Sequence, residues 1–276
     1  MTEDRRPIAI VGGDGKTGRR VAARLEHMGR RVRRVSRSTD PAFDWNESDS
    51  WPAAVAGARS AYVTYQPDLS VPQAYGAIAR LAGLARDARL EHVVLLSGRG
   101  EDGARRAEEA LAAAGVCWTV VRASWFAQNF SESFLADAVR AGELALPVGA
   151  VAEPFVDADD IADVVVAALT GATPSRRIYE VTGPAALTFA EAAEILGRVI
   201  GRPLIFRELT PAAFAEHLRA AGLPDSVVAM LIEVFGTTLD GRNSAVAAGV
   251  EEALGRPART FENYAKLAAT TDVWRN

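Results

Sequence analysis

The chain has 276 residues, of which 49% are apolar and 24% charged, and its formal net charge is -4. This length allows one large α/β domain, or one such domain with a smaller lobe, since single cores rarely grow beyond about 250–300 residues. The composition is that of an ordinary globular chain and excludes extended disorder, and the negative charge argues against a nucleic-acid-binding domain, which is normally basic.

The chain carries no sign of secretion, of a membrane span or of a metal centre. Its N-terminal apolar run, Ile8 to Val11, is too short for a signal-peptide core or a transmembrane helix. The single cysteine, Cys117, cannot form an intramolecular disulfide, and the three histidines lack metal-ligand spacing. We therefore expect a cytoplasmic protein that holds no metal and binds neither nucleic acid nor membrane.

Short apolar runs alternate with helical periodicity in the first half, as in βαβ units with a parallel sheet. Expected strands cover 8–11, 31–35, 60–64, 92–96 and 118–121, with later helices over 72–88 and 104–114. After about residue 129 this alternation of strand and helix patterns becomes weaker. There we expect helices and two minor strands, at 154–156 and 177–181. The sequence predicts a Rossmann-type, doubly wound α/β sheet over 1–130. A smaller, mainly helical substrate lobe over 131–276 would share one continuous core with it.

A glycine-rich segment follows the first expected strand. Gly12, Gly15 and Gly18 form a GxxGxxG pattern between that strand and an amphipathic helix. Such glycines form a tight turn, let the backbone approach a pyrophosphate, and allow the helix to pack closely on the sheet. The helix N-terminus then directs its amides and its dipole at negative charge. The segment predicts a dinucleotide-binding turn.

The triplet Gly15-Lys16-Thr17 also fits the end of a P-loop for nucleoside triphosphates. That motif requires a glycine five positions before Gly15, where this chain has Ile10. We therefore exclude a P-loop. Asp14 brings a carboxylate into the turn, and we expect its side chain to point away from the pyrophosphate.

The end of the second expected strand indicates which dinucleotide is bound. NAD-specific sites carry an acid there, about 20 residues after the turn, to bind the ribose hydroxyls. This chain has Ser36, Arg37 and Ser38 instead. A guanidinium can bind a 2′-phosphate through two hydrogen bonds, whereas an acid would repel it. The sequence therefore predicts NADP(H).

Asp44 and Trp45 follow this strand, in the region where the adenine would lie. We expect them to flank the adenine ring. A helix cap beside a packing aromatic residue explains the same two residues equally well.

Six segments together resemble the atypical short-chain dehydrogenases/reductases of the NmrA-like group. They are GGDGKTG, VSRS, FDW, VVLLSG, VRASWFAQNF and PFVDADDIA. Within this group the ergot-alkaloid reductases of the festuclavine dehydrogenase type are especially similar. The resemblance extends from about residue 7 to residue 274, and it implies a Rossmann fold with NADP(H) as cofactor.

The resemblance also implies roles for individual residues. Those of the cofactor site are Gly12, Gly15, Lys16 and Thr17 at the pyrophosphate, Ser36, Arg37 and Ser38 at the 2′-phosphate, Tyr65, Gln66 and Pro67 beside the ribose, and Ser97 near the nicotinamide. Those of the substrate-pocket wall are Trp125, Phe126 and Asn129.

Two departures from the family pattern bear on the chemistry. The tyrosine and lysine of typical short-chain dehydrogenases, spaced four apart, are absent from residues 103–110, and Ala123 replaces a frequent proline. Ketone reduction needs a positioned acid such as that tyrosine. An iminium ion needs only hydride, and a quinone or conjugated carbonyl can delocalise the developing negative charge. Such acceptors therefore depend less on a positioned acid.

The remaining candidates for catalytic contacts are Ser97, Tyr65 and Ser124. The Ser97 hydroxyl would donate a hydrogen bond to the substrate or to the cofactor amide, although it could instead cap the turn after its strand. We predict an NADPH-dependent reductase of a small organic imine, iminium, quinone or conjugated carbonyl, active as a monomer or homodimer in secondary metabolism. The alternative is a non-catalytic NADP(H)-binding redox sensor, as some NmrA-like proteins are.

Overall fold

The computed structural model describes residues 5–275 and divides into two compact units. The first comprises the residues up to Ala123, Ala158–Val181 and Ala248–Pro257. The second comprises Ser124–Asp157, Thr182–Ala247 and the residues from Ala258 onward. The units are thus built from interleaved segments of the chain. The division into folding domains at 1–130 and 131–276 stays a prediction.

A six-stranded parallel sheet forms the centre of the first unit, in the order β2-β1-β3-β4-β5-β8. Its strands are β1 (Ile8–Val11), β2 (Val32–Val35), β3 (Ser60–Val63), β4 (His92–Gly98), β5 (Trp118–Ala123) and β8 (Arg177–Val181). The predicted Rossmann-type fold class is confirmed. The order reverses between β1 and β3, and in open α/β sheets ligands bind at the carboxyl ends of the strands at this point.

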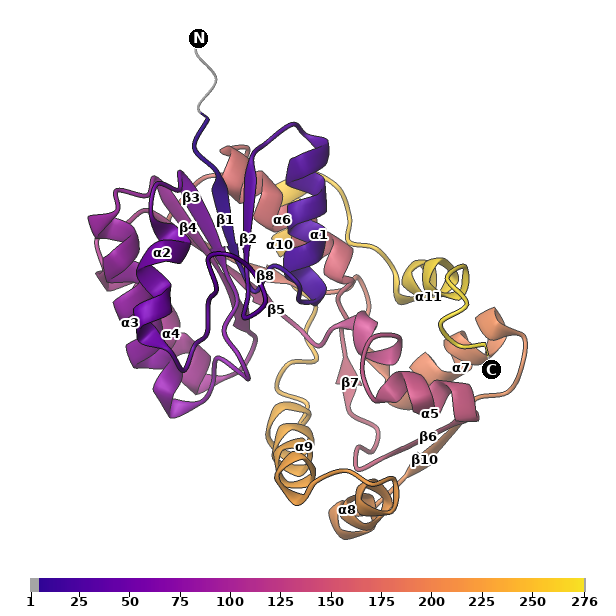
Figure 1. The fold of residues 1–276 in the computed structure, drawn as a ribbon. Helices are drawn as coiled ribbons and strands as arrows, with labels where there is room; N and C mark the ends of the chain where they lie inside the picture. Colours follow the sequence, from indigo (N-terminus) through magenta and orange to yellow (C-terminus); the bar gives the residue numbers. More distant parts are fainter. Residues whose placement is uncertain (1–4, 276) are drawn as a thin grey trace. The chain divides into compact units, whose positions relative to one another are not determined.

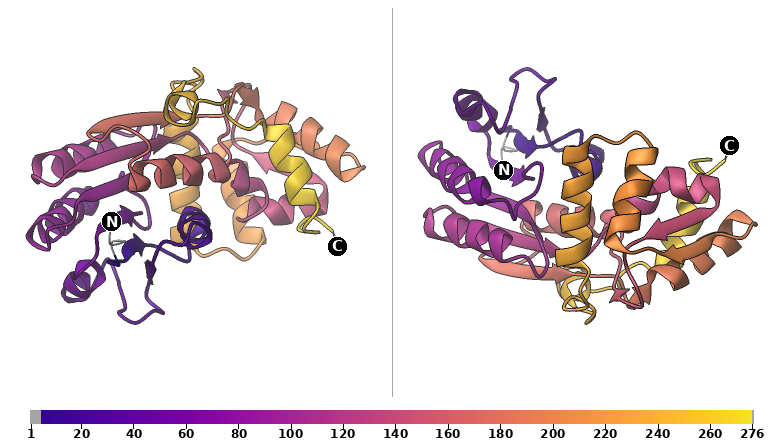
Figure 2. Two further views of the ribbon diagram at one scale, coloured as in Figure 1. Left: turned by 90° about the horizontal axis from the view of Figure 1, so that it is seen from above. Right: turned by 90° about the horizontal axis from the view of Figure 1, so that it is seen from below.

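Helices cover both faces of this sheet (Figures 1 and 2). On one face lie α1 (Lys16–His27), α6 (Ala158–Thr170) and α10 (Gly249–Leu254); on the other lie α2 (Trp51–Val55), α3 (Pro72–Asp87) and α4 (Asp102–Ala113). All four residues of β1 are buried. Continuous apolar runs of this kind are expected where both faces of a parallel sheet are covered.

Ion pairs join α1, α6 and the segment after α10. Arg24 on α1 binds Asp159 and Asp163 on α6, each at 2.6 Å, and Arg256 binds the fully buried Asp160 at 2.8 Å. The acids at the start of α6 therefore hold the helix layer together, because a buried carboxylate needs a paired cation.

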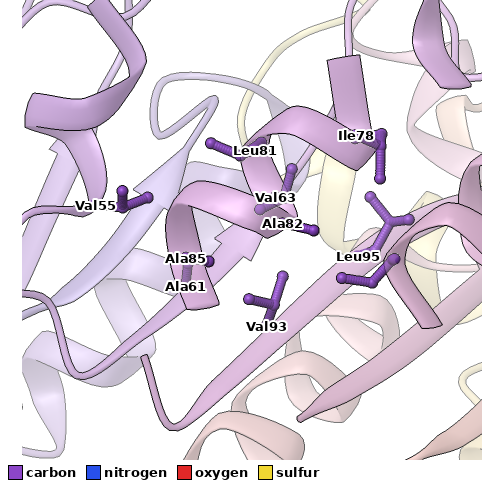
Figure 3. A pocket seen from close by; sticks show the side chains of 10 residues that line it. Val55, Ala61, Val63, Ile78, Leu81, Ala82, Ala85, Val93 and Leu95 are labelled. Atoms are coloured by element: carbon purple, nitrogen blue, oxygen red, sulfur yellow. The ribbon is translucent and has the colours of Figure 1, made fainter. Parts of the chain in front are cut away.

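The core on the opposite face is apolar. Val55, Val63, Leu81 and Leu95 point toward one another from α2, β3, α3 and β4 (Figure 3). The cavity left among them is about 10 Å³, and apolar walls of this kind do not hold an ordered water. This apolar core stabilises the sheet.

The second unit contains two small sheets and five α-helices within the described residues. β6 (Glu143–Leu146) pairs in parallel with β10 (Ile205–Glu208), and β7 (Ala152–Glu153) pairs antiparallel with β9 (Leu187–Thr188). The helices are α5 (Leu135–Ala141), α7 (Phe189–Ile200), α8 (Pro211–Ala220), α9 (Asp225–Thr238) and α11 (Phe261–Ala269). The core of this unit is aromatic: the Phe189 ring contacts Phe130, Phe155 and Phe235 at centroid distances of 5.9, 5.2 and 6.4 Å.

Both strands expected in the second half of the chain need correction. Residues 177–181 are not a minor strand, because they form β8 at the edge of the main sheet, where Tyr179 pairs with Val121. The strand expected at 154–156 is wrong: β7 ends at Glu153, and Val156 forms only an isolated bridge with Phe126.

Candidate functional site

A pocket of about 800 Å³ opens at the carboxyl ends of β1, β2 and β3 in the first unit. It is lined by Gly12, Asp14, Gly15, Ser36, Arg37, Ser38, Phe43, Asp44, Trp45, Asn46, Thr64, Gln66 and Pro67. Nine of these residues were predicted from the sequence to bind the cofactor. The structure therefore brings the glycine turn, the tip of β2 and the loop after β3 to one site, at the point where the strand order reverses.

The glycine turn leaves no room for side chains at two of its positions. Gly12 has φ +80°, and a Cβ there would lie 2.1 Å from Thr64 Oγ1; a Cβ on Gly18 would lie 2.1 Å from the carbonyl oxygen of Gly12. Gly15 is the N-cap of α1, with no side-chain cap and no acid in the first helical turn. The start of α1 thus presents backbone amides that no side chain caps, as an anion site requires.

Lys16, Thr17 and Gly18, which were also predicted at the cofactor, begin α1 and are not among the residues that line the pocket. The Thr17 hydroxyl is buried and accepts a 2.9 Å hydrogen bond from the Tyr62 hydroxyl, whose pKa is raised by burial. This bond ties α1 to β3. The Thr17 hydroxyl is therefore engaged within the protein, and the contact of this residue with the pyrophosphate stays a prediction.

The tip of β2 combines an acid, two hydroxyls and a guanidinium. The Ser36 hydroxyl donates a 2.6 Å hydrogen bond to Oδ2 of Asp14, and the Ser38 hydroxyl lies 3.4 Å from the same oxygen. Arg37 is exposed and has no ion pair or hydrogen bond to its side chain among residues 5–275. Asp14 thus points to the β2 tip, and Arg37 is the one arginine among the residues that line the pocket.

The other arginines of the β2 region have structural partners. Arg33 donates to the Ala56 carbonyl at 2.6 Å, and Arg34 forms an ion pair with Glu26 at 2.8 Å. These two side chains stabilise the sheet edge, which leaves Arg37 as the candidate for a bound phosphate.

An aromatic wall closes one side of the pocket. The Trp45 ring contacts Phe43, Trp51 and Tyr65 at centroid distances of 4.8, 5.4 and 4.7 Å, and its indole nitrogen donates to the Thr64 carbonyl at 3.2 Å. Burial raises the pKa of Tyr65, so its phenol stays protonated at neutral pH.

Asp44 lies beside this wall in a local turn. Its Oδ1 accepts a 2.9 Å hydrogen bond from the Asn46 amide, and its backbone carbonyl accepts the Trp51 indole. Asp44 and Trp45 line the pocket, but Asp44 caps no helix, because the next helical segment begins at Ser48 with Glu47 as its N-cap. Their contact with the adenine stays a prediction.

Ser97 is buried on the α4 side of β4. Its hydroxyl donates a 2.5 Å hydrogen bond to Glu108, which also forms a two-bond pair with Arg122 at 3.0 and 2.5 Å. Arg122 extends the network to Glu180 at 2.8 Å, and its guanidinium holds the pKa of Glu180 below the usual range against the opposing effect of burial. The Ser97 hydroxyl thus binds a side chain of the protein in this structure, and its contact with substrate or cofactor stays a prediction.

Ser124, Trp125, Phe126 and Asn129 belong to the second unit. The Ser124 hydroxyl is buried and donates to the Pro154 carbonyl at 2.6 Å, which is again a structural contact. Trp125 packs on Phe235 at 5.4 Å, and its indole nitrogen is buried with no hydrogen-bond partner among the described residues. An unsatisfied buried donor of this kind requires an explanation, and a ligand acceptor supplies one.

Four pocket residues were not predicted to bind a ligand: Asp14, Phe43, Asn46 and Thr64. Thr64 follows β3 directly, so its place at the carboxyl edge could have indicated it. Asp14 was recognised as a carboxylate within the turn, but its bond to Ser36 depends on the packing of β2 beside β1.

Within residues 5–275, no group of three or more His, Cys, Asp or Glu side chains is placed to hold a metal. None of the helices in this range combines the length and apolar character that a bilayer span requires.

Sequence comparison gives relatives that match nearly the whole chain. It is 30% identical over 288 residues to the NAD(P)H azoreductase of Xenophilus azovorans, covering 95% of this chain and 98% of that protein. The chain belongs to the NmrA-like atypical short-chain dehydrogenases/reductases. It is also 30% identical over 283 residues to festuclavine synthase II of Penicillium roqueforti, covering 94% of this chain and 97% of that protein, which confirms the resemblance to ergot-alkaloid enzymes. No protein-family model matches the chain.

Solved structures of this atypical short-chain dehydrogenase/reductase fold are similar over almost the full length. The NADPH-dependent quinone oxidoreductase QOR2 of Escherichia coli, solved in complex with NADPH, has a TM-score of 0.79 at 20% identity and covers 94% of this chain and 99% of its own. At this identity the likeness establishes the fold.

Proposed function

We propose that the chain is an NADPH-dependent reductase of a small organic molecule, acting on a quinone, a conjugated carbonyl or an imine. The observation that carries the proposal is the pocket at the β1–β3 switch point, which combines an uncapped helix start with the Arg37 guanidinium. The names of the relatives support it, because they include an azoreductase and a festuclavine synthase.

The residues of the pocket fit NADP(H). Gly15 lines the pocket, and the space that a Cβ would occupy there is approached only by the Gly12 carbonyl, at 3.2 Å. That space is where backbone and pyrophosphate can meet. Arg37 would bind the 2′-phosphate, and Asp44 and Trp45 would flank the adenine. The fold neighbour from Escherichia coli, solved with NADPH, supports this assignment.

The cofactor, when bound, supplies a hydride. The chain binds and orients it through the start of α1, Arg37 and the aromatic wall, and this orientation accounts for much of the rate of a hydride transfer. Ser97 and Ser124 contribute by fixing the ends of β4 and β5, because both hydroxyls already donate to protein acceptors. The Trp125 indole, with Phe126 and Asn129, is assigned to substrate, with the indole donating to a substrate oxygen or nitrogen.

The test follows NADPH absorbance with the purified full-length protein and a panel of acceptors: a quinone, a conjugated enone, a cyclic imine and an azo dye. Oxidation of NADPH by at least one of them is the expected result. Calorimetry of NADPH binding accompanies the screen. Tight binding with no turnover of any acceptor would overturn the reductase proposal in favour of a redox sensor, and absence of binding would overturn both.

A further inference from the structure

Two acidic residues, Asp68 and Glu101, stand in the loops that follow the neighbouring strands β3 and β4. Asp68 follows Pro67 of the pocket lining, and Glu101 ends the loop between β4 and α4. Asp68 is held in place by Ser70, whose amide and hydroxyl donate to its Oδ1 at 2.7 and 2.5 Å. Asp68 therefore accepts two hydrogen bonds from Ser70, and these fix its side chain within the loop.

Glu101 has the opposite environment. Its carboxyl group lies over Gly98, where a Cβ would be 2.2 Å from Oε2, and it has no side-chain hydrogen bond or ion pair among the described residues. Burial, together with the negative charge of Asp68, raises the pKa of Glu101 to about 7. A carboxyl group with this pKa can hold a proton near neutral pH, as a general acid must.

The backbone fixes this arrangement. A Cβ on Gly103 would lie 2.0 Å from the carbonyl oxygen of Ser70, so the start of α4 packs directly against the Asp68–Ser70 turn. Gly98 and Gly103, on either side of Glu101, thus admit the carboxyl group and the neighbouring loop. The position of Glu101 follows from main-chain contacts rather than from a flexible surface side chain.

The charged groups around Glu101 do not neutralise it. Arg99 in its own loop binds Glu180 at 3.2 Å, and Asp102 lies 3.7 Å from Arg105 on α4. From the β3–α3 loop, Asp68 adds only negative charge. Glu108, farther along α4, is paired with Arg122.

The strand order directs the cofactor toward this pair of acids. A dinucleotide with its 2′-phosphate at Arg37 on β2 and its pyrophosphate at the turn after β1 continues along the same sheet edge. The next two strands in the order β2-β1-β3-β4 are those that end near Asp68 and Glu101. The proposed function thus places the reactive end of the cofactor on the β3–β4 side.

We infer that Glu101 is the proton donor for reduction of a neutral acceptor. The inference rests on the proposed reductase function. The hydride supplies two electrons and forms a C–H or N–H bond at the acceptor. The electron pair of the acceptor double bond moves to its O or N, which takes the proton from the Glu101 carboxyl; the Glu101 carboxylate is then reprotonated from water.

The test compares wild-type protein with Glu101→Gln on two acceptors. A neutral quinone or enone needs the proton, whereas a permanently charged iminium ion needs only hydride. We expect the variant to reduce the neutral acceptor about 100-fold more slowly, the usual size of a general-acid effect, and the iminium at the wild-type rate. Wild-type kcat/KM for the neutral acceptor should fall tenfold per pH unit above about 7.

A readout independent of turnover is the infrared band of the protonated carboxyl. It should disappear with a midpoint near the Glu101 pKa of about 7 and be absent from Glu101→Gln. The matched control is Glu109→Gln, the same change at an exposed position of α4, which should behave as wild type.

Each outcome decides between the two proposals. Equal slowing of both acceptors by Glu101→Gln, or slowing of neither, would overturn the proton-donor role and leave the reductase intact. A missing carboxyl band would do the same. Failure of the wild type to reduce any acceptor would overturn the reductase function, and the donor role with it.

Discussion

The Ser36 hydroxyl donates a 2.6 Å hydrogen bond to Oδ2 of Asp14, so the turn after β1 and the tip of β2 are joined at the place assigned to the 2′-phosphate. This bond directs a hydroxyl expected at the phosphate toward a carboxylate. Negative charge beside a 2′-phosphate is repulsive, whereas an acid in this region can bind the hydroxyls of an unphosphorylated ribose. We therefore predict that Asp14 and Arg37 have opposing effects on cofactor choice.

Replacement Asp14→Asn should strengthen NADPH binding about tenfold without strengthening NADH binding. The asparagine still accepts from Ser36 but carries no charge, and unit charges about 4 Å apart interact by about 1 kcal/mol in water and ~4 kcal/mol near a protein surface. Calorimetry with each cofactor checks this, with Asp40→Asn as a control for general charge. Equal changes for NADPH and NADH would contradict the assignment of Asp14 to this site.

Replacement Arg37→Ala should weaken NADPH binding about 10–100-fold and leave NADH binding nearly unchanged, since hydrogen bonds to charged groups contribute roughly 1.5–3 kcal/mol. The control is Arg30→Ala, at an exposed arginine before β2 at the opposite end of that strand. The difference between NADPH and NADH should shrink as salt is raised, because an exposed ion pair is screened. A similar loss for both cofactors would exclude selection of the 2′-phosphate by Arg37.

Gly15 and Gly18 should respond differently to alanine. A Cβ on Gly18 would lie 2.1 Å from the Gly12 carbonyl oxygen, so Gly18→Ala should lower the free energy of unfolding by about 3 kcal/mol. At Gly15 the same contact is 3.2 Å. Gly15→Ala should therefore cost about 1 kcal/mol or less in stability, yet weaken NADPH binding about tenfold because the methyl group enters the pocket. Chemical denaturation measures the loss of stability in both variants, and calorimetry measures the loss of NADPH affinity. Equal losses of stability and of affinity in the two variants would contradict this prediction.

The turn between β1 and α1 was predictable because its signals lie within a few residues of one another. A continuous apolar run, three glycines at fixed spacing and a helical period all occur between Ile8 and His27. The tip of β2 follows in the same unit, so Arg37 could be assigned to the pocket from the sequence. The prediction of the fold class and of the cofactor site therefore depends mainly on patterns within short segments of the sequence.

The features that the sequence did not predict depend on contacts between distant segments. Strand β8 joins the sheet by pairing with β5, more than 50 residues earlier, so the five residues themselves could not indicate it. The environment of Glu101 depends on Asp68, which belongs to another loop. The role of Ser97 depends on α4 folding back over β4, which brings Glu108 to its hydroxyl.

Replacement Ser97→Ala should affect stability and not cofactor binding. The hydroxyl donates to the buried Glu108, and its loss should lower the free energy of unfolding by about 1–3 kcal/mol. Arg122→Met, which leaves the Glu108 charge without its partner, should cost about 3–5 kcal/mol. Denaturant unfolding measures both, with NADPH affinity as the second readout. If Ser97 instead contacts the nicotinamide or the substrate, Ser97→Ala will raise Kd for NADPH or KM for the acceptor while leaving stability unchanged, and that result would return Ser97 to the catalytic site.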